Sequence, residues 1–183
     1  GLKALNNKTQ SDILYLRSAI ESASKSLGAL PGDALSKIEP YLLPLHDKLE
    51  EMLPKNEIDV LSKEKRIEGN VVNYIRGASW NAKFFIVDES QNLTIEQMKM
   101  LLTRLGENVK VLIQGDLGQS DIGYNNGLRW AMKEFNDCSL VKVHTAKLTD
   151  VIRSPLVKGL LEHLDAKNTV SEPKTTSRRA ASS

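Results

Sequence analysis

Residues 84–91 read FFIVDESQ, and this stretch decides the fold class. Its four consecutive apolar residues predict a strand that is buried on both faces, and two carboxylates follow at the point where the strand ends. Strands of this kind occur mainly in parallel sheets that helices cover on both sides. We therefore expect an α/β protein.

The rest of the chain alternates between short apolar runs and amphipathic helical patterns. Further strands are predicted at residues 13–16, 71–75, 109–113 and 140–143. Helices are predicted at residues 37–52, 95–105, 128–135 and 154–164, where apolar residues lie at helical spacing. This alternation predicts a three-layer α/β/α fold around a parallel sheet.

Some helix ends carry specific signals. The residues TIEQ at 94–97 form a capping box, and SP at 154–155 predicts an N-cap followed by a first-turn proline. In the pattern at 37–52, Pro40 is expected near the helix start and Pro44 is expected to kink the helix.

Acidic residues follow the strand predicted at 84–87. In open α/β sheets, functional groups gather at the carboxyl ends of strands. Asp88 is expected to hold Mg²⁺ through its water shell, because Mg²⁺ favours carboxylate oxygen and keeps several waters. Glu89 is expected to orient or deprotonate a water aimed at a γ-phosphate. This is a Walker B pattern; the alternative is an ordinary acidic turn at a strand end.

Three motifs follow one another after successive strands: Asp-Glu-x-Gln at 88–91, Gly-Asp-x-x-Gln at 115–119 and Leu-x4-Arg at 148–153. Together they resemble motifs II, III and IV of superfamily 1 helicase-type ATPase cores. The resemblance implies that Gln119 senses the γ-phosphate and that Arg153 contacts it, a role that suits a guanidinium because it forks onto two oxygens. It further implies a nucleotide-binding set of Asp88, Gln91, Gly115 and Asp116.

A closer resemblance covers about residues 11–165. The matching stretches are GALPGD at 28–33, YIRG at 74–77, FIVDESQNLTIEQMKMLLTR at 85–104, DVIR at 150–153 and PLV at 155–157. They are similar to the PhoH-like family, a group of P-loop ATPases in bacteria and their phages that is named for induction under phosphate starvation. The resemblance implies an ATP-binding, RecA-like core that uses Mg²⁺. It also implies single-stranded RNA or another nucleic acid as a partner, and a homo-oligomer.

The sequence departs from the family's pattern at three places. Arg17 is followed by Ser18 where members usually carry Arg-Pro, and Ser90 stands where alanine is common. No Gly-x-x-x-x-Gly-Lys-Ser/Thr loop occurs in the sequence, although such a loop supplies the N–H groups and the lysine that hold a triphosphate. We therefore expect residues 1–165 to form a core without its N-terminal strand and Walker A loop. Alone, this chain should bind ATP weakly or not at all, and it should be less stable and prone to self-association.

Two functions fit these residues. The first is ATP binding and hydrolysis coupled to RNA, carried by Asp88, Glu89, Gln119 and Arg153. The second is a degenerate module of the same fold that binds nucleic acid or protein without hydrolysis. The intact quartet favours the first function, and the missing loop favours the second.

Composition limits the other possibilities. The chain has 183 residues and a net charge of +2, too small for charge alone to indicate nucleic-acid binding. Any RNA binding must therefore come from a local patch, for which Lys63, Lys65 and Arg66 with the tail at 166–183 are the candidate. On its own, the basic cluster at 63–66 is more simply explained as a solvated loop. Trp80 and Trp130 are expected to be core or domain-surface aromatics rather than base-stacking platforms.

The composition also bears on the cellular location of the protein and on disorder in the chain. No apolar run approaches the roughly twenty residues of a membrane span, so we expect no membrane helix. Cys138 is the single cysteine and cannot form an internal disulfide, and three histidines do not complete a zinc site, which favours a reducing cytoplasm. Residues 166–183 are rich in Ser, Thr, Lys and Arg, and we expect a disordered tail there.

Overall fold

The computed structural model of the chain describes residues 1–19, 34–75, 80–146, 157, 159–160 and 163. The chain divides into two compact units, Gly1–Val141 and Lys142–Ser183. The first unit contains the sheet and the helices described below.

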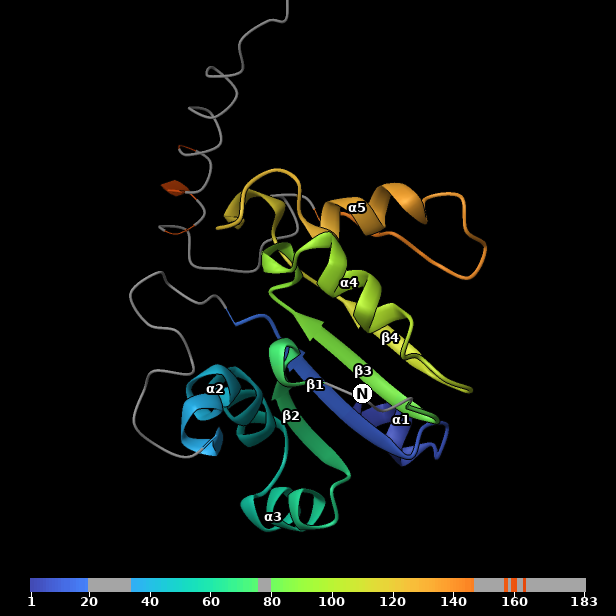
Figure 1. Cartoon of the computed structure of the whole chain (residues 1–183). Helices are drawn as coiled ribbons and strands as arrows, with labels where there is room; N and C mark the ends of the chain where they lie inside the picture. Colours follow the sequence, from blue (N-terminus) through green and yellow to red (C-terminus); the bar gives the residue numbers. More distant parts are fainter. Residues whose placement is uncertain (20–33, 76–79, 147–156, 158, 161–162, 164–183) are drawn as a thin grey trace, which may run out of the picture. The chain divides into compact units, whose positions relative to one another are not determined.

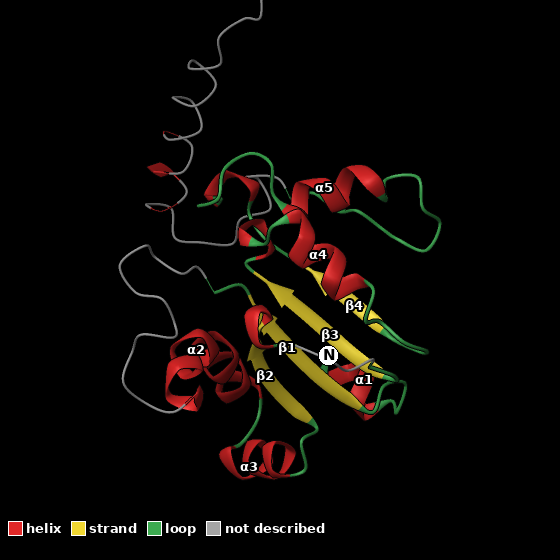
Figure 2. Ribbon diagram, viewed as in Figure 1, coloured by secondary structure: helices red, strands yellow, loops and turns green. Residues whose placement is uncertain are grey.

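A four-stranded parallel sheet runs through the first unit (Figures 1 and 2). The strand order is β2-β1-β3-β4. The strands are β1 (Asp12–Arg17), β2 (Ile67–Val71), β3 (Lys83–Asp88) and β4 (Lys110–Ile113). The register pairs Arg17 with Asp88, so these two residues end neighbouring strands at the same edge of the sheet.

Helices pack on both faces of this sheet, as the three-layer prediction requires (Figure 2). One face is covered by α1 (Leu2–Asn6), α2 (Ala34–Met52) and α3 (Lys55–Lys63). The other is covered by α4 (Ile95–Leu102) and α5 (Gly127–Glu134). Short 3-10 turns are η1 (Val72–Tyr74), η2 (Ser90–Asn92) and η3 (Leu117–Gln119).

The tightest packing lies between the sheet and α4. Leu16 of β1 and Phe85 of β3 are wholly buried, together with Met98 and Leu101 of α4. Complete burial of such a side chain contributes about 1.5–3 kcal/mol. This packing fixes the ends of β1 and β3, from which the polar groups of the candidate site project.

The capping box at the start of α4 is confirmed. The Thr94 hydroxyl accepts from the Gln97 backbone N–H at 3.2 Å, and the Gln97 side chain accepts from the Thr94 N–H at 2.9 Å. The helix ends at Leu102 rather than at residue 105. Leu105 instead forms a parallel bridge with Trp80, because the chain has already turned toward the next strand.

Two of the predicted strands are wrong. The second strand is β2, at Ile67–Val71, and residues 72–74 form η1 instead of continuing it. The apolar pattern missed this strand because its middle residues are Glu, Gly and Asn, and Gly69 packs against Leu42 and Leu45 of α2.

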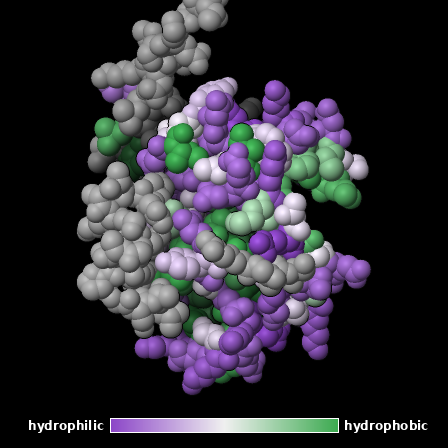
Figure 3. Space-filling model, viewed as in Figure 1, coloured by the Kyte–Doolittle hydropathy of each residue, from purple (hydrophilic) through white to green (hydrophobic). Residues whose placement is uncertain are grey.

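Residues 140–143 form no strand either. Leu140 is 92% exposed, and the Val141 N–H donates to the Cys138 carbonyl in a turn. In Figure 3 hydrophobic side chains gather on the segment that follows α5, where this apolar run lies at the surface.

The helix predicted at 37–52 is longer than expected. It begins at Ala34, so Pro40 lies in its second turn rather than near its start. Helix α2 continues through both Pro40 and Pro44, although each proline removes one backbone donor. Ile38 and Leu49 of α2 are buried against the sheet, and this burial offsets the lost hydrogen bonds.

Several sequence predictions lie outside the described residues. They are the stretch at 28–33, the helix start at 154–155, the motif at 148–153 with Arg153, and the tail at 166–183. Within the described part of the chain, no helix combines the length and the apolar character that crossing a bilayer requires.

Candidate active site

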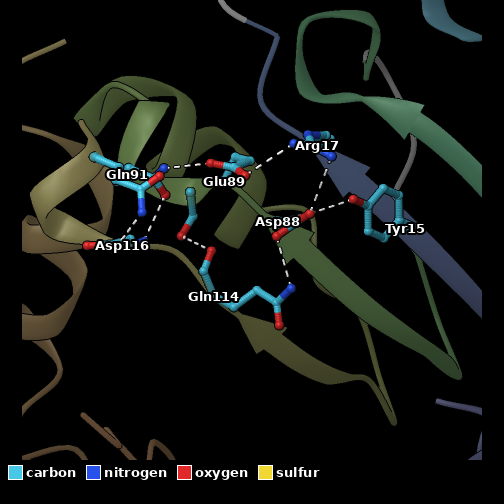
Figure 4. A network of polar contacts seen from close by, with 9 residues as sticks. Tyr15, Arg17, Asp88, Glu89, Gln91, Gln114 and Asp116 are labelled. Carbon is cyan, nitrogen blue, oxygen red and sulfur yellow. Dashed lines mark hydrogen bonds and ion pairs between the residues drawn. The ribbon is translucent and has the colours of Figure 1, made fainter. Parts of the chain in front are cut away.

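Polar side chains from three parallel strands meet at the carboxyl edge of the sheet (Figure 4). Asp88 ends β3, Arg17 ends the neighbouring strand β1, and Gln114 follows β4 directly. Since β1 and β4 flank β3 on either side, Asp88 receives contacts from both directions.

Asp88 is held by three neighbours. The Tyr15 hydroxyl donates to Asp88 Oδ2 at 2.5 Å, and Gln114 Nε2 donates to Asp88 Oδ1 at 2.9 Å. Arg17 Nη1 lies 3.8 Å from Asp88 Oδ2. The Asp88 side chain is 19% exposed, so the carboxylate is fixed in direction but still reaches solvent.

Tyr15 is suited to this role because it stays protonated. Burial raises the pKa of the Tyr15 hydroxyl, and its hydrogen bond to Asp88 and the Asp88 charge raise the pKa further. The charge of Arg17 works in the opposite direction but does not outweigh these effects. At neutral pH Tyr15 is therefore a hydrogen-bond donor to an ionised carboxylate.

The backbone of Glu89 adopts a left-handed conformation. Its φ of 51° and ψ of 36° lie in the left-handed region, which costs an L-residue roughly 1–2 kcal/mol. This conformation turns the chain from β3 into η2, and the N–H and hydroxyl of Ser90 both donate to the Gln114 carbonyl. Strained backbone of this kind gathers at functional sites.

The Glu89 carboxylate has a partner on each oxygen. Arg17 Nη2 donates to Oε1 at 3.1 Å, and Gln91 Nε2 donates to Oε2 at 2.6 Å. The side chain is 38% exposed, about twice as much as that of Asp88. Glu89 is thus the carboxylate of the pair that is more open to solvent water.

Gln91 connects Glu89 to the loop that follows β4. Its side chain is 1% exposed, and its Oε1 accepts from the Asp116 N–H at 3.1 Å. The Ser120 hydroxyl donates to the Gln91 carbonyl at 2.9 Å. A Cβ on Gly115 would collide with the Gln91 side-chain oxygen, so this close approach requires glycine.

Asp116 and Gln119 pair with each other on this loop. Gln119 Nε2 donates to Asp116 Oδ2 at 2.7 Å, while Asp116 Oδ1 accepts from the Gly118 N–H at 2.8 Å and caps η3. The structure therefore links five of the predicted residues in one chain of contacts: Glu89, Gln91, Gly115, Asp116 and Gln119. Asp88 adjoins them through Arg17, and Arg153 lies outside the described residues.

Sequence reasoning missed three members of this network: Tyr15, Arg17 and Gln114. Tyr15 lies inside an apolar run, where an aromatic is expected to be core. Arg17 and Gln114 directly follow apolar runs that were correctly predicted as strands, so their position at strand ends was the available signal.

Ser18, at the position where the resemblance led us to expect proline, makes contacts at this edge. Its backbone N–H donates to the Asp88 carbonyl at 3.3 Å, a bond that proline cannot form. Its hydroxyl donates to the Asn92 carbonyl at 3.0 Å. Ser18 thus ties the end of β1 to both the end of β3 and η2.

The donor set of Asp88 and Glu89 fits a hard divalent cation such as Mg²⁺. Carboxylate oxygen is its preferred ligand, and Mg²⁺ is usually bound by one or two carboxylates together with waters and phosphate oxygens. The described residues contain no group of three or more His, Cys, Asp or Glu side chains that could enclose a metal ion. A Mg²⁺ here would accordingly rely on Asp88, water and a bound phosphate.

The amino edge of the sheet carries a separate ion-pair cluster. Arg66 Nε lies 3.3 Å from Asp12 Oδ1 and donates to the Ser11 carbonyl at 2.6 Å, and Lys83 Nζ lies 3.1 Å from Asp12 Oδ2. Arg66 is therefore an ion-pair partner of Asp12, and its side chain is 38% exposed.

The two tryptophans pack inside the first unit, as predicted. Trp80 lies against Phe85 with ring centroids 5.2 Å apart, and Trp130 lies edge-on to Phe135 at 5.8 Å. Both pairs adjoin the core between the sheet and α4.

A parallel sheet flanked by helices, with this acidic pair at its carboxyl edge, defines an α/β protein of the RecA-like P-loop NTPase fold. The family described as PhoH-like protein matches residues 1–165. The chain belongs to the PhoH-like family.

Named relatives agree with this assignment. The chain is 39% identical to a PhoH-like protein of Bacillus subtilis (strain 168), over 90% of this chain and 52% of that protein. It is 42% identical to one of Mycobacterium tuberculosis, over 97% and 50%. It is 35% identical to Protein PhoH of Escherichia coli (strain K12), over 87% and 46%. The chain thus spans about half the length of these relatives.

Proposed function

We propose that this chain is part of a PhoH-like ATPase in which the Asp88–Glu89 pair serves hydrolysis of ATP. The observation that carries the proposal is the pair's placement at the carboxyl edge of a parallel sheet, with each carboxylate oriented by its own donors. A bound Mg²⁺ would neutralise charge on the phosphates and orient them for in-line attack.

The chain's own residues then divide the work. Asp88, fixed by Tyr15 and Gln114, holds the water shell of the metal ion. Glu89, the more exposed carboxylate, orients the attacking water and accepts its proton. Gln119 contacts the γ-phosphate from the loop after β4, and Arg153 stabilises the charge on the transferring phosphoryl group.

Replacing Glu89 tests the hydrolytic part of this proposal. Glu89→Gln keeps the size and shape of the side chain but removes the base, and it replaces one of the two oxygens that accept from Arg17 and Gln91 by an amide donor. In the protein that carries this chain, turnover of ATP should fall by roughly 10²-fold or more, with nucleotide affinity within a few-fold of wild type. Glu96→Gln, on an exposed acid in the first turn of α4, is the matched control.

The results separate the two candidate functions. Unchanged turnover in Glu89→Gln removes Glu89 from the mechanism. Absent turnover in the wild type, combined with retained binding of nucleic acid or protein, favours the non-hydrolysing module instead.

Arg153 requires a kinetic test of its own. A cation that contacts the γ-phosphate mainly during transfer affects the rate more than binding. Arg153→Ala should therefore lower kcat strongly while leaving ADP affinity nearly unchanged. Loss of the folded state in this variant would instead make Arg153 a structural ion-pair partner.

One observation supports coupling to single-stranded RNA. Tyr124 is 71% exposed, and the Arg129 guanidinium lies 3.8 Å from the centre of its ring. Aromatic and guanidinium faces stack on unpaired bases with little dependence on sequence. The loop that carries Tyr124 is tied through Ser120 to Gln91, next to Glu89, so binding there has a physical route to the site.

Tyr124→Ala tests that contact. Stacking of one base contributes roughly 1–3 kcal/mol, so affinity for a single-stranded oligonucleotide should fall by about 5- to 150-fold. Tyr74→Ala, at an exposed tyrosine in η1, is the control and should bind like wild type. Fluorescence anisotropy at low salt measures both variants, and equal affinities would exclude Tyr124 as a stacking platform.

We also propose a cytoplasmic location and a homo-oligomeric assembly for the protein. The single cysteine, Cys138, fits a reducing compartment. A ring or dimer would allow a subunit to supply an arginine across its boundary, and light scattering on the purified protein tests for such an assembly.

A further inference from the structure

Arg17 occupies a singular position beside the acidic pair. Its two guanidinium nitrogens reach different carboxylates: Nη1 lies 3.8 Å from Asp88 and Nη2 lies 3.1 Å from Glu89. Among the described residues, Arg17 is the one cation within ion-pair distance of either acid. Its side chain is mostly buried, which keeps the interaction from being strongly screened by solvent.

Arg17 competes with a divalent cation for the two carboxylates, both by its charge and by its hydrogen bond to Glu89. With Arg17 in place, the three side chains carry a net charge of −1, whereas the acidic pair alone would carry −2. Arg17 also takes Glu89 Oε1, one of the oxygens that a metal ion or its water shell would use. A metal ion that approaches this edge therefore meets both a competing charge and an occupied acceptor.

The two carboxylates differ in how firmly the rest of the chain holds them. Asp88 keeps Tyr15 and Gln114 as donors even without Arg17. Glu89 would keep Gln91 alone, and its carboxylate is the more exposed of the two. Release of Arg17 would thus leave Asp88 in place and free one oxygen of Glu89.

We propose that Arg17 is the resident counter-cation of the Asp88–Glu89 pair, which competes with a divalent cation for these carboxylates and releases Glu89 Oε1 when the cation binds. Arg17 is then a positioning residue that acts through Glu89. The proposal rests on the metal-binding role of Asp88 given above, and it adds a residue to which the family resemblance assigned no part.

Metal affinity without nucleotide is the direct test. Mn²⁺, which substitutes for Mg²⁺ and is detected by electron paramagnetic resonance, is titrated into the full chain. Removal of a unit charge a few ångströms from the site predicts that Arg17→Gln binds Mn²⁺ roughly fivefold or more tightly than wild type. Arg17→Lys keeps the charge and should stay close to wild type.

The control is Arg66→Gln, which removes the same charge from an ion-paired arginine at the opposite edge of the sheet. Its Mn²⁺ affinity should equal that of the wild type. Thermal melting followed by circular dichroism shows whether each variant is folded, and Arg17→Met, which also removes the charge, takes the place of Arg17→Gln if that variant melts early.

The outcomes are distinct for the two proposals. Unchanged or weaker Mn²⁺ binding in Arg17→Gln, or equal tightening in Arg17→Lys, overturns the counter-cation role. Asp88→Asn tests the metal site separately, because it should abolish Mn²⁺ binding whatever residue 17 is. If neither wild type nor Arg17→Gln binds Mn²⁺, the inference fails, while the Glu89→Gln turnover assay still decides the proposed hydrolysis.

Discussion

At the scale of single residues, the site depends on groups whose chemistry is set by close neighbours. Tyr15 is an example, because its hydroxyl donates to an ionised carboxylate inside a partly buried network. Hydrogen bonds to charged groups contribute about 1.5–3 kcal/mol, more than those between neutral groups. Tyr15 should therefore contribute to stability as well as to the orientation of Asp88.

The raised pKa of Tyr15 makes this contribution depend on pH. A group whose pKa is higher in the folded state stabilises that state below the unfolded value, here 10.0, and the stabilisation is lost as pH rises further. The wild type should be more stable than Tyr15→Phe near neutral pH, and the difference should narrow above about pH 10. Urea unfolding at several alkaline pH values measures it.

Tyr74→Phe is the control for alkaline effects that are unrelated to the site, since Tyr74 is an exposed tyrosine in η1. A constant difference between wild type and Tyr15→Phe across the alkaline range would contradict the assigned interaction with Asp88.

Gly115 gives a second prediction at this scale. A methyl group there would collide with the Gln91 side-chain oxygen and crowd the Gln91 backbone nitrogen. Gln91 is buried, so its side chain has little room to move away. Gly115→Ala should destabilise the fold by about 1–3 kcal/mol, as overpacking usually does, and should displace Gln91 from Glu89.

Gly118→Ala, three residues further along the same loop, is the matched control. A Cβ at Gly118 would approach the Asp116 carboxylate at 3.2 Å, a side-chain atom that can shift. Equal melting temperatures for Gly115→Ala and wild type would show that the contact between Gly115 and Gln91 is not tight.

At the scale of elements, α4 is the helix whose start is most clearly specified by its own sequence. The capping box formed by Thr94 and Gln97 satisfies backbone donors at its first turn, and its buried face packs on β1 and β3. The η2 turn just before α4 carries Gln91, so the helix start also stabilises the end of the acidic motif.

Removal of this cap should weaken the fold by a modest amount. Thr94→Ala should lower the free energy of unfolding by about 1 kcal/mol, because the Gln97 N–H loses its acceptor. Thr103→Ala removes an exposed hydroxyl at the other end of the same helix and should cost less. Chemical denaturation compares them, and an equal loss in both would argue against a special role for the capping box.

At the scale of the whole molecule, the sequence predicts the parallel α/β sheet from its apolar strands, and β1, β3 and β4 lie where those runs occur. It fails for β2, whose middle residues are polar or glycine and whose strand character comes from pairing with β1. It also fails at residues 140–143, because an apolar run without a neighbouring strand stays exposed.

The candidate site likewise has a part that the sequence pattern predicts and a part that it misses. Asp88, Glu89 and Gln91 are adjacent in sequence and could be found as a motif. Tyr15 and Arg17 join them only through the parallel register, since each lies about seventy residues away along the chain. Contacts across strands depend on strand order, which the motifs and apolar patterns of a single sequence do not reveal.

At the amino edge of the sheet, Asp12 of β1 pairs with Lys83 of β3 and with Arg66, the residue before β2. Burial alone would raise the pKa of Asp12, but hydrogen bonds from Ser11 and Lys83 and the charges of Lys83 and Arg66 outweigh burial and lower the pKa below 3.8. A carboxyl group with a lowered pKa stabilises the folded state above its unfolded value, and this stabilisation is lost as pH falls. Wild type should therefore lose stability in acid more steeply than Asp12→Asn, over the range below about pH 5.

Asp47→Asn is the matched control for this comparison, since Asp47 lies on α2 and takes part in none of the ion pairs at the amino edge. Urea unfolding at neutral pH and at several acidic values gives the free energy of each variant. Parallel loss of stability in wild type and Asp12→Asn would mean that the ion pairs with Arg66 and Lys83 contribute nothing to the folded sheet. Convergence of the two curves in acid would instead show that the Asp12 carboxylate stabilises the folded sheet through Arg66 and Lys83, at the edge opposite to Asp88 and Glu89.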